Sequence, residues 1–421
     1  MTAVGAFSAA AWPYAAKLAW APVVDCVSAR DAAPRWLLSL CPSLATLGPR
    51  KSWIVPVQLA SSVLMLARGP AAAAAVAAGD ARGAAAFFLP LVALAATQDV
   101  AVDGWALVLL SRSRVGYAST CQTFGTNAGF FLSCAALLAL GDPSFCASWS
   151  GSPPGVAVWT LAGYLRFWGW AYACVTAAVA VGTTEARAPP GEPLPPRDAR
   201  RALTRVAAAY ADLAAVARLP AVRRLGVLLL TCRLAVLPAE AVAPLALASK
   251  GVSTQAVAGL VLLQLPAELV AALLAGRAAA AGSASRAWVG GYWLRLAAAA
   301  ATTLVVVTMP DGGAAPSSGC MGALAGLGLA TAATSALQFT LLGALYARVG
   351  DPAMGGAYLT LLNTVANVGL TLPKAVAFWA ADAVGLGPAS AAALLGGLAL
   401  GAWYAVAMPA LERAPLKAWR A

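Results

Sequence analysis

The chain has 421 residues, of which 61% are hydrophobic and only 10% are charged. Soluble domains carry roughly 25% charged residues and about 45–50% apolar ones, so this composition excludes a soluble protein and predicts a polytopic membrane protein. The 28 Lys and Arg residues outnumber the 16 Asp and Glu residues, but there is no zinc-finger spacing and no basic stripe with interleaved aromatic residues. Nucleic-acid binding is therefore not expected.

Few side chains suit catalysis or metal binding. The sequence has no His, which excludes acid–base or nucleophilic chemistry based on that residue. Its eight Cys residues are scattered, mostly within apolar segments, and none forms a C-x-x-C pair, so neither a disulfide framework nor a metal site is expected. A phosphate-binding G-x-x-x-x-G-K-[ST] loop is also missing. We expect neither metal, ATP nor another cofactor, and no enzyme activity.

Long apolar segments define the fold class. A membrane-spanning helix needs roughly 20 mostly apolar residues. The segments that meet this requirement lie near residues 3–24, 52–78, 84–109, 116–140, 162–182, 225–248, 255–276, 287–309, 320–346, 356–381 and 388–410. The sequence thus predicts an all-α polytopic membrane protein with about 11 transmembrane helices.

A polar segment divides these spans into two groups. Residues 183–223 contain five prolines between residues 189 and 196, followed by a helix-compatible run rich in Arg. We predict an N-terminal helical bundle over 1–182, a basic cytoplasmic linker over 183–223, a C-terminal bundle over 224–411 and a cytoplasmic tail over 412–421. Two six-helix halves joined by such a linker form the major facilitator architecture. Five spans before the linker and six after it suggest that the first helix is missing from this chain.

The distribution of basic residues predicts the orientation. Positive residues of short loops stay on the cytoplasmic side of a membrane. Most of the 28 Lys and Arg residues fall in the C-terminal tail and in alternate loops, near residues 26–51, 110–115, 183–224, 277–286 and 347–355. The opposite loops hold only Arg68, Arg82 and Lys250. We therefore expect the C-terminus in the cytosol and the N-terminus on the other side.

An unusually polar stretch lies late in the third expected span. Residues 95–107 read AATQDVAVDGWAL and place Asp99 and Asp103 four residues apart, on one face of a helix, with Gln98 beside them. Ionisable groups at membrane depth are expensive and must face protein or water. These residues are therefore candidates for a functional charge network. A network that merely packs the helices of the first bundle together is an equally weighted alternative.

Five stretches together carry a family resemblance. They are Tyr14 to Asp25 (YAAKLAWAPVVD), Arg50 to Trp53 (RKSW), Ala95 to Leu107, Gly116 to Cys121 (GYASTC) followed by Gly125 and Gly129, and Gly355 to Gly369 (GGAYLTLLNTVANVG). In this order and spacing they resemble the acetyl-coenzyme A transporters of the endoplasmic reticulum, a branch of the major facilitator superfamily. The resemblance extends over nearly the whole chain.

The resemblance implies a secondary transporter of the endoplasmic reticulum or Golgi membrane. Such a protein imports acetyl-CoA from the cytosol into the lumen by alternating access, in exchange for CoA. This sequence departs from the family pattern in its missing first helix, an insertion around 31–47, and Lys374 in place of a small polar residue. Three alternatives stay open: a permease for another large anionic solute such as a muropeptide, a membrane-embedded acyltransferase that uses acetyl-CoA, and a non-transporting scaffold.

Cations within or near the expected spans are candidates for binding the phosphates of such a substrate, because Arg in particular donates parallel hydrogen bonds to them. Lys17 lies about 12 Å deeper than Asp25 at 1.5 Å per residue, and we weigh anion binding evenly against an ion pair with a carboxylate such as Asp99. For Arg233 we favour the substrate. Arg166 and Arg295 lie near span ends, where we expect them to reach the interface.

Carboxylates near these cations have other expected roles. Glu240 lies seven residues after Arg233, between Pro238 and Pro244, which should kink the helix. A structural link from Glu240 to an Arg of a neighbouring helix is at least as probable as a role in coupling. Asp99 and Asp103 would pair with Lys17 or Arg233, or bind a coupling proton. Asp25 with Arg50 and Lys51 resembles the gating loop of facilitator transporters.

Aromatic and small polar residues complete the candidate site. Trp105 and Tyr117 could stack on an adenine ring, as any aromatic face can. Thr120 and Asn363 are polar groups on otherwise apolar helices and are kept as candidate substrate contacts, although hydrogen bonds between helices are their usual role. The expected partners are acetyl-CoA, CoA and the lipid membrane.

Overall fold

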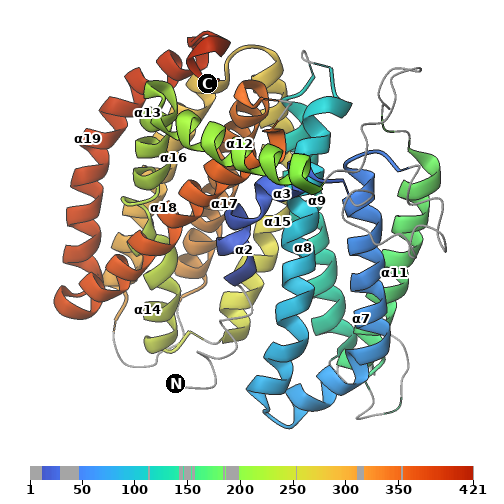
Figure 1. Cartoon of the computed structure of the whole chain (residues 1–421). Coiled ribbons are helices and arrows are strands. Elements are labelled where there is room, and N and C mark those ends of the chain that lie inside the picture. The colour runs from blue at the N-terminus through green and yellow to red at the C-terminus, as the bar shows by residue number, and fades with distance from the viewer. Residues whose placement is uncertain are drawn as a thin grey trace. The chain divides into compact units, whose positions relative to one another are not determined.

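The computed structural model describes residues 12–28, 47–111, 114–141, 157–183, 199–252, 254–310, 317–351 and 354–420, together with residues 146, 153 and 185 (Figure 1). Within these ranges the regular structure is helical and contains no β-strand, which confirms the all-α prediction. Residues 3–11 of the first expected span and residues 31–46 of the insertion near 31–47 lie outside the described residues.

Before the linker the chain forms short helices followed by long ones. Three short segments come first: α2 (Trp12–Ala16), the 3₁₀ helix η2 (Lys17–Ala19) and α3 (Ala21–Cys26). The long helices are α7 (Lys51–Ala77), α8 (Ala81–Leu109), α9 (Tyr117–Gly141) and α11 (Leu161–Gly182).

The second part of the chain begins with the linker helix. The helices are α12 (Ala199–Arg218), α13 (Pro220–Thr231), η3 (Pro238–Val242), α14 (Ala243–Ser249), α15 (Thr254–Ala280), α16 (Ala284–Thr308), α17 (Ser318–Val349), α18 (Gly355–Val384), α19 (Leu386–Arg413) and the short η5 (Leu416–Ala418). Among the described residues, 8 helices are long and apolar enough to cross a membrane: α7, α8, α11, α15, α16, α17, α18 and α19.

The expected span near 225–248 is a broken helix. Helix α13 ends at Thr231, the chain then turns, and it resumes as the π-helix η3, which leads into α14. Pro238 and Pro244 stand at the starts of η3 and α14, where a residue without a backbone N–H is tolerated. The expected span is thus interrupted at residues 232–236, on the N-terminal side of Pro238. Short π-helical turns are frequent at functional sites.

The helices cluster into two compact units. Unit 1 comprises Met1–Leu109, Leu132–Ala215 and Gly350–Leu361, and unit 2 comprises Leu110–Phe131, Val216–Val349 and Leu362–Ala421. In unit 1, α7 packs along α8 and α11, and α2 and α3 lie against α8. In unit 2, α15 and α16 both pack against α17, and α19 packs against α16.

Unit 2 has a core of buried aromatic rings. The rings of Trp288 and Tyr292 are stacked with centroids 6.1 Å apart, and the ring of Tyr404 meets that of Tyr292 edge-on at 4.9 Å. All three side chains are fully buried, and such pairs add stability beyond the area they bury. The Tyr292 hydroxyl donates to the carbonyl oxygen of Gly397, which ties α16 to α19.

Close backbone contact between α13 and α18 depends on Gly369. A Cβ atom at this position would overlap the carbonyl oxygen and carbon of Leu229, which are backbone atoms and cannot swing aside. A Cβ atom at Gly396, in contrast, would meet no atom within 4 Å. Small residues of this kind let membrane helices approach closely.

Gly369→Ala should therefore lower the free energy of unfolding by about 1–3 kcal/mol, the usual cost of overpacking. Gly396→Ala is the matched control, because it makes the same exchange in a helix where there is space. The check is the midpoint of thermal unfolding of the purified protein in detergent. Equal midpoints for the two variants would contradict the close contact.

Candidate functional site

A buried ammonium group lies in unit 1. Lys17 belongs to the 3₁₀ turn η2 and is 2% exposed. Its Nζ donates to Oδ2 of Asp99 on α8 and lies 5.4 Å from the centre of the Tyr14 ring. Of the two roles weighed for Lys17, the structure has the ion pair. Because breaking a buried pair leaves an uncompensated charge, this contact fixes η2 on α8.

Further polar and aromatic residues of α8 lie near this pair in the sequence. One turn after Asp99, the side chain of Asp103 is buried, and Gln98 is half-buried. Trp20 Nε1 donates to Oγ1 of Thr97 at 3.2 Å, a second link between the N-terminal helices and α8. Trp105 is half-buried and packs against the apolar core of unit 1. Lys17, Asp99 and Asp103 thus form one charged cluster on α8 and η2.

A second cluster in unit 1 centres on Asp25, at the end of α3. Its carboxylate pairs with the Arg50 guanidinium and accepts hydrogen bonds from the backbone N–H groups of Gly356 at 3.2 Å and Ala357 at 2.5 Å. These amides open α18, where the helix dipole favours a negative group. A Cβ at Gly356 would lie 2.7 Å from both Asp25 Oδ1 and the backbone carbonyl oxygen of Val100, so this glycine lets the carboxylate approach the start of α18.

Burial raises the pKa of the Asp25 carboxyl, and Arg50 together with the two amides of α18 acts in the opposite direction. The carboxylate therefore needs these donors to stay charged.

Lys51 binds backbone carbonyl oxygens, whereas its neighbour Arg50 binds a carboxylate. Its Nζ donates to the carbonyl oxygens of Ala180 at 2.9 Å and Thr183 at 2.7 Å, at the end of α11. In return, the Glu185 carboxylate accepts from the backbone N–H groups of Arg50 and Lys51, each at 3.0 Å, at the start of α7. Each helix end thus receives the charge that its dipole favours.

Unit 2 holds a buried ion pair of its own. Arg295 on α16 is 4% exposed, and its Nε and NH2 groups donate to the two oxygens of Glu240 at 2.6 and 2.7 Å. Its NH1 group donates to Oε1 of Gln338 on α17 at 2.9 Å. The expectation that Arg295 reaches the membrane interface is wrong, because it lies mid-helix and is held by this bidentate pair. Glu240 thus has the structural link to a neighbouring helix that we weighed for it.

Arg233 lies in the turn that interrupts the broken helix, between α13 and η3. Its side chain is half-buried and has no ion-pair partner among the residues that the structure describes. It is therefore a cation still available to an anion. Because the chain turns between residues 232 and 236, Arg233 and Glu240 do not lie on one continuous α-helix.

A cavity of about 320 Å³ adjoins Glu240 and is formed by η3, α14, α15, α16 and α17. Three further polar side chains line it from α15 and α16: Gln264, Glu268 and Thr302. Sequence analysis did not single these residues out, although an acid inside an apolar span is a functional hypothesis by default. The signal was present at Glu268, within the span expected near 255–276.

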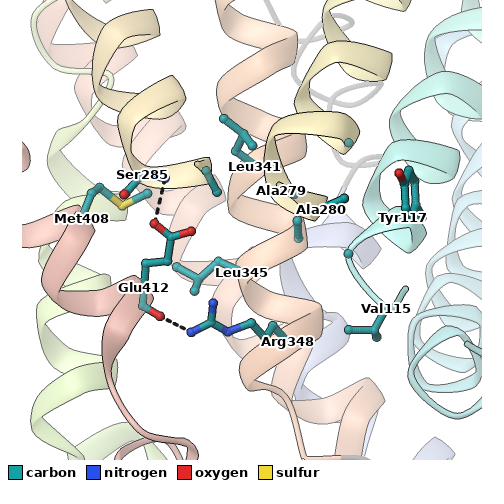
Figure 2. A pocket seen from close by; sticks show the side chains of 14 residues that line it. Val115, Tyr117, Ala279, Ala280, Ser285, Leu341, Leu345, Arg348, Met408 and Glu412 are labelled. Carbon is teal, nitrogen blue, oxygen red and sulfur yellow. Dashed lines mark hydrogen bonds between the residues drawn. The ribbon is translucent and has the colours of Figure 1, made fainter. Parts of the chain in front are cut away.

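A smaller cavity of about 100 Å³ lies elsewhere in unit 2 (Figure 2). Tyr117 lines it from one side, and Arg348 and Glu412 line it from the other. The Glu412 carboxylate accepts from the backbone N–H of Ser285 at 3.1 Å, at the start of α16, while Arg348 donates to the Glu412 carbonyl oxygen. Tyr117 and Glu240 therefore line different cavities.

The candidate residues are divided between the two units. Unit 1 holds Lys17, Asp25, Arg50, Lys51, Gln98, Asp99, Asp103 and Trp105, and unit 2 holds Tyr117, Thr120, Arg233, Glu240 and Asn363. Thr120 is buried and its hydroxyl faces Gly276, which has no side chain there, while Asn363 is half-buried on α18. Cationic and aromatic candidates thus occur in both units.

Comparison with known sequences decides the family. A family profile described as "Acetyl-coenzyme A transporter 1" matches residues 1–287 and 281–392. The chain belongs to the acetyl-coenzyme A transporter family. This confirms the resemblance inferred from the sequence motifs.

Two relatives of this family member come from yeasts. An uncharacterized protein of Schizosaccharomyces pombe is 28% identical over 384 residues, covering 89% of this chain and 67% of the relative. An uncharacterized membrane protein of Saccharomyces cerevisiae is 28% identical over 440 residues, covering 89% of this chain and 76% of the relative.

Solved structures with a similar fold are major facilitator transporters. The fucose:proton symporter of Escherichia coli superposes with a TM-score of 0.55 at 15% identity, covering 96% of this chain and 97% of that one. The human organic anion transporter MFSD10 (TETRAN) gives a TM-score of 0.53 at 15% identity, covering 96% of this chain and 98% of that one. The acetyl-coenzyme A transporter family member is thus an integral membrane transporter with the major facilitator fold.

The buried pair of unit 2 can be tested with a double-mutant cycle. Arg295→Leu should lower the free energy of unfolding by about 3–5 kcal/mol, because it leaves Glu240 without its cation. The double variant Arg295→Leu, Glu240→Leu should recover most of this loss. Thermal or denaturant unfolding in detergent measures the free energy of unfolding of the single and the double variant. A double variant that is less stable than Arg295→Leu would show that the two side chains act independently.

Proposed function

We propose that this protein carries acetyl-CoA across an endomembrane by alternating access. The observation that carries the proposal is the family match, which extends over residues 1–392. The fold supports it, since major facilitator transporters hold their substrate between two bundles that rock about it. No step of this scheme breaks or forms a covalent bond in the substrate, so the proposed role is that of a carrier and not of an enzyme.

The substrate is a polyanion, and its phosphates require cations. Arg233 suits this role best, because it is half-buried in a helix break and has no carboxylate partner among the described residues. A planar guanidinium can donate two parallel hydrogen bonds to a phosphate group. Lys17 is already paired with Asp99, so in this proposal it meets the substrate only when that pair opens.

The Asp25 cluster is proposed to act as a gate. One carboxylate holds Arg50 and the first turn of α18, and α18 continues from unit 1 into unit 2. A change of the bundles' arrangement that moves α18 would have to break these charge-assisted bonds. The cluster would therefore stabilise one of the two conformations of the transport cycle.

Direction, exchange and location complete the proposal. We propose import from the cytosol into the lumen of the endoplasmic reticulum or Golgi, by antiport with CoA, with a cytosolic C-terminus. The distribution of Lys and Arg among the loops supports this orientation. Acetyl-CoA that is formed in the cytosol would thereby reach lumenal acetylation reactions.

Purified protein in liposomes tests the proposal. Labelled acetyl-CoA should accumulate inside, and preloading the liposomes with CoA should speed its uptake. Empty liposomes serve as the control. Uptake that does not depend on internal CoA would leave a carrier but remove the exchange. Release of free acetate without accumulation would favour a membrane-embedded acyltransferase or hydrolase and overturn the proposal.

Two variants separate binding from conformational change. Arg233→Ala should raise the apparent KM for acetyl-CoA about tenfold or more, because a hydrogen bond to a charged group contributes about 1.5–3 kcal/mol. Arg166→Ala is the matched control, because this Arg is exposed on α11. An unchanged KM in Arg233→Ala would contradict its assignment to the phosphates.

Asp25→Asn should leave the KM of acetyl-CoA uptake within about twofold but change the maximal rate, because it removes the charge that holds the start of α18. Initial uptake rates over a range of acetyl-CoA concentrations measure both quantities. A large KM change at constant maximal rate would place Asp25 in the binding site instead of the gate.

A further inference from the structure

The cavity beside Glu240 has side chains ready for hydrogen bonds with a ligand. Gln264 and Glu268 line it from α15, Thr302 lines it from α16, and Thr331 and Ser335 line it from α17. Their side chains are half-exposed, and none has a hydrogen-bond partner within the described part of the chain. Free polar groups in membrane-spanning helices are costly unless water or a ligand meets them.

Neighbouring hydroxyls on the same helices behave differently. Thr303 donates to the carbonyl oxygen of Ala299 at 2.9 Å, and Thr334 donates to that of Ala330 at 2.8 Å. Both side chains are buried, and each hydroxyl donates to a backbone carbonyl oxygen of its own helix. Thr302, one residue before Thr303, and Ser335, one residue after Thr334, face the cavity without such a bond. On these stretches of α16 and α17, the hydroxyls that face the cavity lack a bond to their own helix, and the buried hydroxyls beside them have one.

The charge of this cavity does not suit phosphates. Its charged lining groups are Glu240 and Glu268, and no Lys or Arg lines it among the described residues. Glu240 is neutralised by the bidentate contact with Arg295, which leaves Glu268 as an acid without a cation. A phosphate group placed here would meet a carboxylate and no counter-ion in a medium of low dielectric constant.

The cavity suits an uncharged chain that has amide and hydroxyl groups. The carboxyl of Glu268 accepts from amide N–H groups, Gln264 both donates and accepts, and the hydroxyl of Thr302 donates to carbonyl oxygens. Leu247, Leu260 and Leu324 supply apolar walls. Its volume of about 320 Å³ falls in the range of small-molecule sites.

Gly328 gives Gln264 the space it occupies on this wall. A Cβ at that position of α17 would lie 2.8 Å from Nε2 of Gln264. Because the residue has no side chain, the amide of Gln264 can lie between α15 and α17 at the edge of the cavity.

We propose that this cavity of unit 2 binds the acetylated pantetheine arm of the substrate, apart from the nucleotide. The inference rests on the proposed transport of acetyl-CoA and adds which part of the substrate this cavity recognises. The pantetheine arm is uncharged and carries two amides, a hydroxyl and the thioester. The adenine nucleotide carries all the phosphates and must lie where cations are available, such as near Arg233.

Competition between substrate fragments tests this division. Uptake of labelled acetyl-CoA into liposomes is measured against two inhibitors, acetyl-pantetheine and 3′-phosphoadenosine 5′-diphosphate. In Gln264→Leu, the concentration of acetyl-pantetheine needed for half inhibition should rise about tenfold, while that of the nucleotide stays within about twofold. Thr302→Val, a smaller change, should act in the same direction. Thr303→Val is the matched control and should alter neither value.

Each outcome decides between the possibilities. If acetyl-pantetheine does not inhibit the wild-type carrier, or if the variants weaken both inhibitors equally, the cavity does not select the pantetheine arm, while the transport proposal stands. Wild-type protein that accumulates no acetyl-CoA overturns the proposed function, and this inference with it. Binding of acetyl-pantetheine to purified Thr302→Val, followed as a shift of the unfolding midpoint, supports the inference if it is weaker than in Thr303→Val and contradicts it if it is equal.

Discussion

A cation buried almost completely inside a membrane-spanning protein needs a partner, and this requirement shapes both units. Lys17 in unit 1 is held by Asp99, and Arg295 in unit 2 is held by Glu240 and Gln338. In each pair one member lies on a long helix and the other on an irregular segment, the 3₁₀ turn η2 or the π-helix η3. Because a buried pair is costly to break, it fixes the irregular segment on its helix. The irregular segments η2 and η3 thus stay attached to their neighbouring helices.

A second interaction recurs in the structure: carboxylates accept hydrogen bonds from the first backbone amides of helices. Asp25 accepts from the first amides of α18, Glu185 from those of α7, and Glu412 from that of Ser285 on α16. Each acid comes from a segment distant in sequence and meets the partial positive charge of the helix terminus. Arg50 and Arg348 add a cation beside two of them. Such bonds are strong but reversible, as the proposed alternating access requires.

The sequence predicts the fold well because hydropathy and helix length follow directly from the bilayer. Pro238 and Pro244 also mark the span in which the helix is broken, although the break itself lies just before Pro238. The sites are less predictable, because pairing depends on which helix faces which. Arg295 was expected at the interface, yet α16 buries it against Glu240, 55 residues away along the chain. Gln264 and Glu268 became candidates only through the cavity that four other elements complete around α15.

The most direct test of this account exchanges the charges of the pair in unit 1. Lys17→Asp and Asp99→Lys are made singly and together, and the midpoint of thermal unfolding is compared in detergent. Each single variant places two like charges side by side and should unfold well below the wild type. The double variant restores opposite charges and should recover most of the lost stability. A double variant no more stable than the single ones would show that these charges do not hold the unit together.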